Sequence, residues 1–274
     1  LDEIKNDITG KTCACFEPTL DYIVVKMPKW PFDKFADASR ALGTQMKATG
    51  EVMSIGRTME ESLLKAVRSL ETGVCHIYHK KFDKWSNDDL LAYIKGGTDD
   101  RIYAIAQLIR NGVDLALIYN NTKIDMFFLE KFKNIVEFEN VVRAHPMDVE
   151  TLRAAKRMGF SDKYIGQLWG LSQNEMYRLR EKNNVFPVYK MIDTCASEFA
   201  SYVPYFYSTY EEENESIVSG KEKIIVLGSG PIRIGQGVEF DYSTVHAIWS
   251  IRAAGYEAII INNNPETVST DYTT

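Results

Sequence analysis

The sequence has no long apolar run and few cysteines, and each shortage excludes a class of protein. No stretch approaches the roughly eighteen consecutive apolar residues of a membrane-spanning helix, so we expect no span. The four cysteines, Cys13, Cys15, Cys75 and Cys195, lack the spacing of a zinc site or a disulfide framework. We therefore expect reduced, structural thiols in a reducing compartment, which favours a cytoplasmic location.

Histidine is equally scarce, with four residues in the chain. His76 and His79 could share a face as metal ligands, but no neighbouring carboxylate or second ligand pair completes a metal shell. Surface or partly buried histidines are the better interpretation. The formal net charge of −6 argues against a surface built as a whole for nucleic acid, although a local basic patch stays open.

The composition is that of ordinary globular protein. The 274 residues are 45% hydrophobic and 26% charged, enough for two domains or one large domain with a real core. The chain begins at Leu1 without an initiator methionine and ends at Thr274, just after a strand-like run. We expect a piece of a longer protein, so the lack of a targeting sequence carries no information.

The first zone mixes strand and helix signals. Residues 22–27 are β-branched and aromatic, which predicts a strand that is ended by Pro28 and Pro31. Residues 33–42 have helical spacing, with Asp33 as a possible cap, and are followed by a loop or short strands.

A second helix is predicted after Thr58. Glu61 has the three-residue spacing of a capping box with this threonine. The helix carries one apolar stripe, formed by Leu63, Leu64, Val67 and Leu70.

The middle zone, residues 72–215, is dominated by helix patterns and nearly lacks strand signals. Caps, terminal glycines and apolar periodicity predict helices within residues 86–97, 99–112, 123–143, 148–159, 161–170 and 172–183. From residue 185 onward the chain is rich in aromatics and ends in an acidic run. We interpret that part as an irregular, packed segment that leads into a linker.

The last zone predicts one βαβ unit of a parallel sheet. An apolar run at 223–227, a helix after a loop, and a second apolar run at 257–261 have the required order. Such a unit is buried on both faces, so we expect the sheet to need more strands than residues 221–274 provide.

The glycine loop between these elements resembles a phosphate-binding turn. Gly228, Gly230 and Gly235 follow a strand and precede a helix, where backbone amides could hold a phosphate. The dinucleotide fingerprint, however, requires glycine at Arg233, and Pro231 removes a donor. The acid expected at the next strand is also missing, so a role other than nucleotide binding is favoured.

Residues 161–180 have the helix, glycine turn and helix of a DNA-binding hairpin. The local charge is modestly basic, but Trp169 and Tyr177 fit a helical core as well as a DNA groove. The alternative function is therefore a helix-turn-helix DNA-binding regulator with the α/β unit as a ligand sensor.

Several long segments resemble the large subunit of carbamoyl phosphate synthetase. "GSGPIRIGQGVEFDYSTVHA" and "GYEAIIINNNPETVSTDY" are similar to the opening of the second synthetase half. "NDITGKTCACFEPTLDYIVVKMPKWPFDKF" and "TQMKATGEVMSIGRTMEESLLKA" resemble the end of the first ATP-grasp half. "NVFPVYKMIDTCASEFASYVPYFYSTYEEE" is similar to the end of the intervening helical domain, and residues 72–180 carry the likeness by position and helical content.

The resemblance implies a mainly α fold: a helical oligomerisation domain flanked by an N-terminal mixed α/β segment and a C-terminal truncated βαβ, or pre-ATP-grasp, unit. The implied boundaries are 1–71 for the end of the first (carboxyphosphate) half, 72–215 for the helical oligomerisation domain, and 216–274 for the linker and the start of the second (carbamoyl phosphate) half.

The implied activity is that of a glutamine-hydrolysing carbamoyl phosphate synthase, an ATP-dependent carbon–nitrogen ligase. It combines bicarbonate, ammonia from glutamine and two ATP, and its product serves arginine or pyrimidine biosynthesis. The intact enzyme would need ATP with Mg or Mn, and K, but no catalytic, cofactor or metal residue of the family maps onto this segment. We expect the segment alone to be inactive. The implied partners are the small glutaminase subunit, the rest of the large subunit and a second copy of the helical domain, with no nucleic acid and no membrane.

Four positions match residues that line the family's internal passage for carbamate: Glu51, Gly237, Glu239 and Glu266. Such a passage needs hydrogen-bonding walls that exclude bulk water. Glycine at 237 would keep it open. The alternative is that these glutamates simply cap helices or pair with an arginine.

Overall fold

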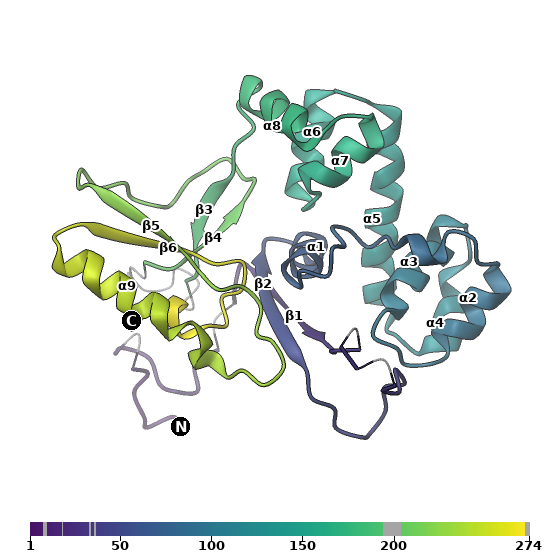
Figure 1. The fold of residues 1–274 in the computed structure, drawn as a ribbon, viewed down its shortest axis with the longest axis horizontal. Helices are drawn as coiled ribbons and strands as arrows, with labels where there is room; N and C mark the ends of the chain where they lie inside the picture. The colour runs from purple at the N-terminus through teal and green to yellow at the C-terminus, as the bar shows by residue number, and fades with distance from the viewer. Residues whose placement is uncertain (8–9, 18, 33, 36, 194–203, 272–274) are drawn as a thin grey trace.

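The computed structural model describes the chain except residues 8–9, 18, 33, 36, 194–203 and 272–274 (Figure 1). Its described part is mainly helical with three small two-stranded sheets, which confirms the predicted fold class. No helix in this part is both long and apolar enough to cross a bilayer.

The first sheet pairs β1 (Ile23–Lys29) with β2 (Gly50–Gly56) in antiparallel register, from Ile23 opposite Gly56 to Lys29 opposite Gly50. The prediction that Pro28 ends the strand was wrong, because β1 continues through it. Since β1 pairs on one side only, the missing amide of Pro28 can lie on the unpaired side.

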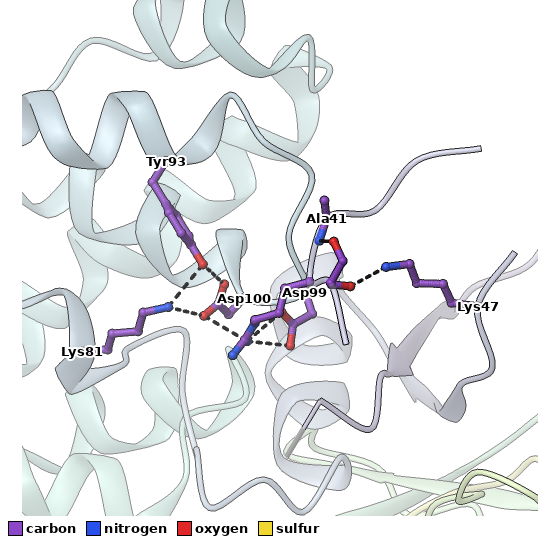
Figure 2. Close-up of polar contacts among 8 residues, drawn as sticks. Ala41, Lys47, Lys81, Tyr93, Asp99 and Asp100 are labelled. Carbon is purple, nitrogen blue, oxygen red and sulfur yellow. Dashed lines mark hydrogen bonds and ion pairs between the residues drawn. The ribbon is translucent and has the colours of Figure 1, made fainter. Parts of the chain in front are cut away.

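The helix predicted at 33–42 is also wrong, since none of the described residues there is helical; Asp33, its expected cap, lies outside the described residues. Polar side chains of this segment instead form hydrogen bonds and ion pairs with residues far along the chain (Figure 2). The Arg40 guanidinium holds Asp99 at 2.7 Å and Asp100 at 3.3 Å. Asp100 also accepts from Lys81 (2.8 Å) and Tyr93 (2.6 Å), which ties the segment to the helices.

Helix α1 (Met59–Ser69) begins as predicted at Thr58, whose hydroxyl accepts from the amide of Glu61 at 3.2 Å. The capping box is not closed in the expected way, because the Glu61 carboxylate accepts from the amide of Arg57 at 2.8 Å. Leu63, Leu64 and Val67 lie in the large helical core. A neighbouring face of α1, with Ala66, contacts β1 and β2, so this helix is packed against both the helical core and the first sheet.

The helical unit continues from there. Its elements are η1 (Lys80–Phe82), α2 (Asn87–Ile94), α3 (Arg101–Arg110), α4 (Leu115–Thr122), α5 (Met126–Ala144), α6 (Val149–Arg157), α7 (Asp162–Trp169) and α8 (Gln173–Lys182). The long helix α5 joins the α2–α4 group to the α6–α8 group (Figure 1). All six predicted helices of this zone are present, whereas α4 was not predicted. Ser172 and Glu175 form a complete capping box at α8.

A buried charge lies inside this unit. Glu139 of α5 is fully buried and accepts from Arg110 at 2.6 and 3.0 Å, and from His76 at 3.1 Å. Burial alone would raise the pKa of Glu139, but the hydrogen bonds from Arg110 and His76 lower that pKa to about 2. Burial lowers the pKa of His76 to about 4, against the opposing effect of Glu139. His76 is therefore a buried structural residue. Because the folded chain lowers the pKa values of both Glu139 and His76, the unfolded chain binds more protons at these two groups, and acid favours unfolding.

The segment after residue 185 is more regular than expected. β3 (Val188–Met191) and β4 (Phe206–Thr209) form an antiparallel pair, so the interpretation as irregular structure was wrong. Tyr207 of β4 packs with Ile55 of β2 and Ile192, which gives the pair its own small core. Cys195 lies outside the described residues, and Cys13, Cys15 and Cys75 are free thiols.

The C-terminal βαβ unit is present as predicted. β5 (Lys223–Leu227) and β6 (Glu257–Ile261) are parallel, with Lys223 opposite Glu257, and α9 (Tyr242–Ala253) connects them. Two short 3₁₀ turns complete the unit: η2 (Val238–Asp241) directly precedes α9, and η3 (Val268–Thr270) follows β6.

The buried charge in α5 generates a first prediction. Glu139→Gln should lower the free energy of unfolding by about 3–5 kcal/mol at neutral pH, because it leaves the buried Arg110 without its carboxylate. Urea denaturation measures this. Glu137→Gln, on the same helix but with a side chain 62% exposed, is the matched control and should change little. Equal effects of the two substitutions would contradict the structural role of Glu139.

Candidate functional site

Two of the four predicted site residues, Glu51 and Glu266, lie near the place where β2 meets the glycine loop. Glu51 and Ile232 form an antiparallel bridge: the Glu51 amide donates to Ile232 O at 3.0 Å, and the Ile232 amide donates back at 3.1 Å. Gly50 makes this approach possible, since a Cβ there would lie 2.2 Å from Ile232 O. Two segments far apart in the sequence are thus joined by their backbones.

The side chain of Lys26 brings two of the four predicted residues together. Its ammonium lies 3.1 Å from Glu51 Oε1 and 2.8 Å from Glu266 Oε1. The hydrogen bond that Lys26 donates to Glu266 is the main reason that the pKa of Lys26 is raised. We call these three residues the Lys26 group. Glu51 and Glu266 are 30% and 27% exposed, so neither is a fully buried charge, although Glu266 Oε2 is itself buried and has no hydrogen-bond partner among the residues that the structure describes.

Gly237 and Glu239 form a second, separate pair at η2, where Gly237 is the N-terminal cap and Glu239 lies within the turn. Both are exposed, and a Cβ at Gly237 would lie 2.2 Å from Glu239 Oε2, so a side chain there would displace this carboxylate. No ion pair or hydrogen bond between described residues joins Glu239 to the Lys26 group. The structure therefore groups the predicted residues two by two.

Asn264, which the sequence did not identify as a site residue, fixes the backbone around the Lys26 group. It is fully buried; its carbonyl accepts from the amides of Met53 (3.0 Å) and Glu266 (3.2 Å), and its amide donates to Gly230 O at 3.3 Å. One side chain thus connects β2, the glycine loop and the turn that carries Glu266. Three successive asparagines directly after the strand-like run at 257–261 were the sequence signal, since asparagine readily bonds nearby backbone.

The amides of the glycine loop are largely engaged by the chain itself. Gly230 N donates to the Asn262 carbonyl at 3.2 Å, Ile232 N to Glu51 O, and Arg233 N to the Gln236 side chain at 3.0 Å. A phosphate would have to displace these bonds. The geometry agrees with the interpretation that this loop is not a nucleotide site.

The basic residues of the α7–α8 hairpin are partly turned inward. The Arg180 guanidinium is 10% exposed and lies 2.8 Å from Asp162, and Trp169 donates to Val142 O at 2.6 Å. Tyr177 is half-exposed. Arg180 and Trp169 are therefore held within the helical unit, whereas Lys163, Arg178 and Lys182 stay exposed.

The structure also provides a test of the implied nucleotide and metal requirements. Among the residues it describes, no group of three or more histidine, cysteine, aspartate or glutamate side chains could hold a metal ion. The loop amides of Gly230, Ile232 and Arg233 already donate within the chain, so nucleotide phosphates could use them only at the loss of those bonds.

Two family models match the chain. The oligomerisation domain of the carbamoyl-phosphate synthetase large chain matches residues 51–184, and the preATP-grasp domain of carbamoyl phosphate synthase matches residues 220–274. The two matches occur in the order that the sequence resemblance implied. The first covers α1 to α8, and the second covers the βαβ unit.

The bridge at Gly50 generates a second prediction. Gly50→Ala should destabilise the chain by about 1–3 kcal/mol, because the added methyl group overlaps the Ile232 carbonyl. Thermal unfolding measures the loss, and hydrogen exchange should show weaker protection of the Glu51 and Ile232 amides. Gly43→Ala is the control, since a Cβ there meets nothing within 4 Å. Unchanged exchange in Gly50→Ala would show that the bridge does not depend on this glycine.

Proposed function

Because the chain belongs to the carbamoyl-phosphate synthetase large-chain family, we propose that it acts in a glutamine-dependent ligase that joins bicarbonate and ammonia at the expense of two ATP. Within that enzyme, the segment links the two synthetase halves. In this proposal, residues 1–71 end the first half, residues 72–215 form the helical oligomerisation domain, and residues 216–274 form the linker and the start of the second half. The small glutaminase subunit is the proposed source of ammonia. The proposal places the phosphoryl chemistry of the enzyme outside these residues.

The segment's own chemical role, in this proposal, is to line part of a passage for carbamate. The observation that carries it is the meeting of Glu51 and Glu266 at the Lys26 ammonium, 3.1 and 2.8 Å away. Two adjacent carboxylates would repel an anionic intermediate, but a shared cation offsets one of the two charges. The group then offers hydrogen-bonding oxygens with less repulsion. Gly237, beside Glu239, adds no side-chain bulk.

This role generates a third prediction, for the intact enzyme. Glu266→Arg should place a cation against Lys26 and fill the wall with a larger side chain, so overall synthesis should fall at least tenfold. The bicarbonate-dependent ATPase and the partial back reaction should be retained, because neither active site is altered. Glu239→Arg should behave in the same way.

Glu213→Arg is the control, because its side chain is 86% exposed and distant in sequence from both pairs. It should leave all three activities unchanged. A parallel fall of both partial reactions and of overall synthesis in Glu266→Arg would indicate damage to folding and would overturn the passage role.

The helical unit supports subunit association, as the matched oligomerisation domain indicates. We propose that the surface where α4 passes into α5 takes part in contact with a second copy. Four large apolar side chains are 39–50% exposed there: Leu117, Tyr119, Phe127 and Phe128. Exposed apolar groups concentrated over one short stretch are typical of an interaction surface.

A fourth prediction follows from this surface. Phe128→Glu should weaken self-association at least tenfold, because it introduces a charge into an apolar contact, and analytical ultracentrifugation over a range of concentrations measures it. Val218→Glu, at an equally apolar but 79% exposed position outside the helical unit, should leave association unchanged. Identical sedimentation of wild type and Phe128→Glu would place the contact elsewhere.

A further inference from the structure

A cavity of about 560 Å³ lies away from the predicted passage residues. Its walls come from α1, from the turn that joins α6 to α7, and from residues beside and within the β3–β4 pair. The volume is within the range of about 300–1,000 Å³ that is usual for small-molecule sites. None of Glu51, Gly237, Glu239 or Glu266 lines it.

Four cationic side chains line this cavity: Lys65, Arg68, Lys156 and Lys163. Two of them already have carboxylate partners in its wall. Lys65 lies 2.8 Å from Glu61, and Lys156 lies 2.9 Å from Asp162. These two pairs leave little net charge.

The other two cations have no such partner. Arg68 donates to the carbonyl of Gly159 at 2.6 Å, but within the part of the chain that the structure describes, no carboxylate lies at ion-pair distance from it or from Lys163. The remaining acid of the wall, Glu71, lies 3.8 Å from Arg233. Burial lowers the pKa of the Arg68 guanidinium, although arginine stays charged at physiological pH. The wall thus holds four cations and three acids, a net charge of +1, and Arg68 and Lys163 are the two cations in it without an ion pair among the described residues.

Backbone donors are present at the same wall. Helix α7 has eight residues and begins at Asp162, and its cap Ser161 and its second residue Lys163 both line the cavity. Ser161 satisfies the amide of Tyr164, whereas the first two amides of a helix have no partner within the helix. The positive end of the helix dipole therefore adds to the field of Arg68 and Lys163.

We propose that this cavity binds a phosphate group of a small molecule, with Arg68 and Lys163 as the charged contacts and the first turn of α7 as the backbone donor. Arg68 and Lys163, which have no ion-pair partner among the described residues, can both contact a phosphate, whose charge is about −1.5 to −2 at neutral pH. The planar guanidinium of Arg68 can donate to two phosphate oxygens at once. This site is independent of the proposed passage, and it needs none of the passage residues.

Calorimetric titration of the 274-residue chain with inorganic phosphate tests the proposal. Sodium chloride and succinate at matched ionic strength are the comparison ligands. We expect saturable binding of phosphate, weaker binding of the dicarboxylate and none of chloride. Preference for succinate over phosphate would assign the cavity to carboxylates and overturn the proposal, as would heats that do not saturate.

Variants locate the binding. Arg68→Gln should weaken phosphate binding about tenfold or more, because it removes a charge-assisted, two-oxygen contact. Lys163→Gln should weaken it several-fold, and since Lys163 is exposed, this variant should fold even if Arg68→Gln does not. Arg178→Gln removes the same charge from an exposed position on α8 outside the cavity and should bind as wild type does. Equal weakening in Lys163→Gln and Arg178→Gln would show general charge attraction and overturn the site.

Discussion

The two-sided burial of α1 is the constraint on which the other parts depend. One face contributes Leu63, Leu64 and Val67 to the core of the helical unit, and the other packs Ala66 and Leu70 against Val52 of β2. Each fully buried leucine or valine contributes roughly 1.5–3 kcal/mol of transfer free energy, so neither face is readily released. Because β2 carries Glu51, the position of the candidate passage wall is fixed by the packing of a helix that belongs to the helical unit.

The Lys26 group shows how a polar surface can be kept at moderate cost. Fully buried carboxylates would require strong pairing, as Glu139 has with Arg110 inside the helical unit. Glu51 and Glu266 instead keep about a third or less of their side-chain surface in contact with solvent and share one cation. Asn264, which is fully buried, fixes the turn beneath them. The position of the turn that carries Glu266 is therefore fixed by the neutral amide of Asn264. The charged groups of Glu51, Glu266 and Lys26 remain partly exposed to solvent.

The sequence predicted well wherever the determining contacts are local. Caps such as Thr58 and Ser172, and apolar stripes at helical spacing, fix helices through neighbours a few residues away. The prediction failed where contacts between distant residues determine the structure. Residues 33–42 have helical spacing, but they are not helical, and Arg40 forms an ion pair with Asp99. The role of Lys26 was also out of reach, because nothing in its own segment shows that two glutamates, one of them 240 residues away, will meet there.

Local sequence pattern and available hydrogen-bond donors also differ between the two possible anion sites, the glycine loop and the cavity beside α7. The glycine loop has the composition of a phosphate-binding turn, yet its amides at Gly230 and Ile232 donate to Asn262 and Glu51, so the chain supplies its own acceptors. The wall at α7 has no glycine-rich motif, but Arg68 and Lys163 lack carboxylate partners among the described residues. A hydrogen bond to a ligand contributes more when it replaces a bond to water than when it must displace an existing protein bond. Donor availability, rather than motif, therefore places the stronger anion site beside α1, on the helical unit.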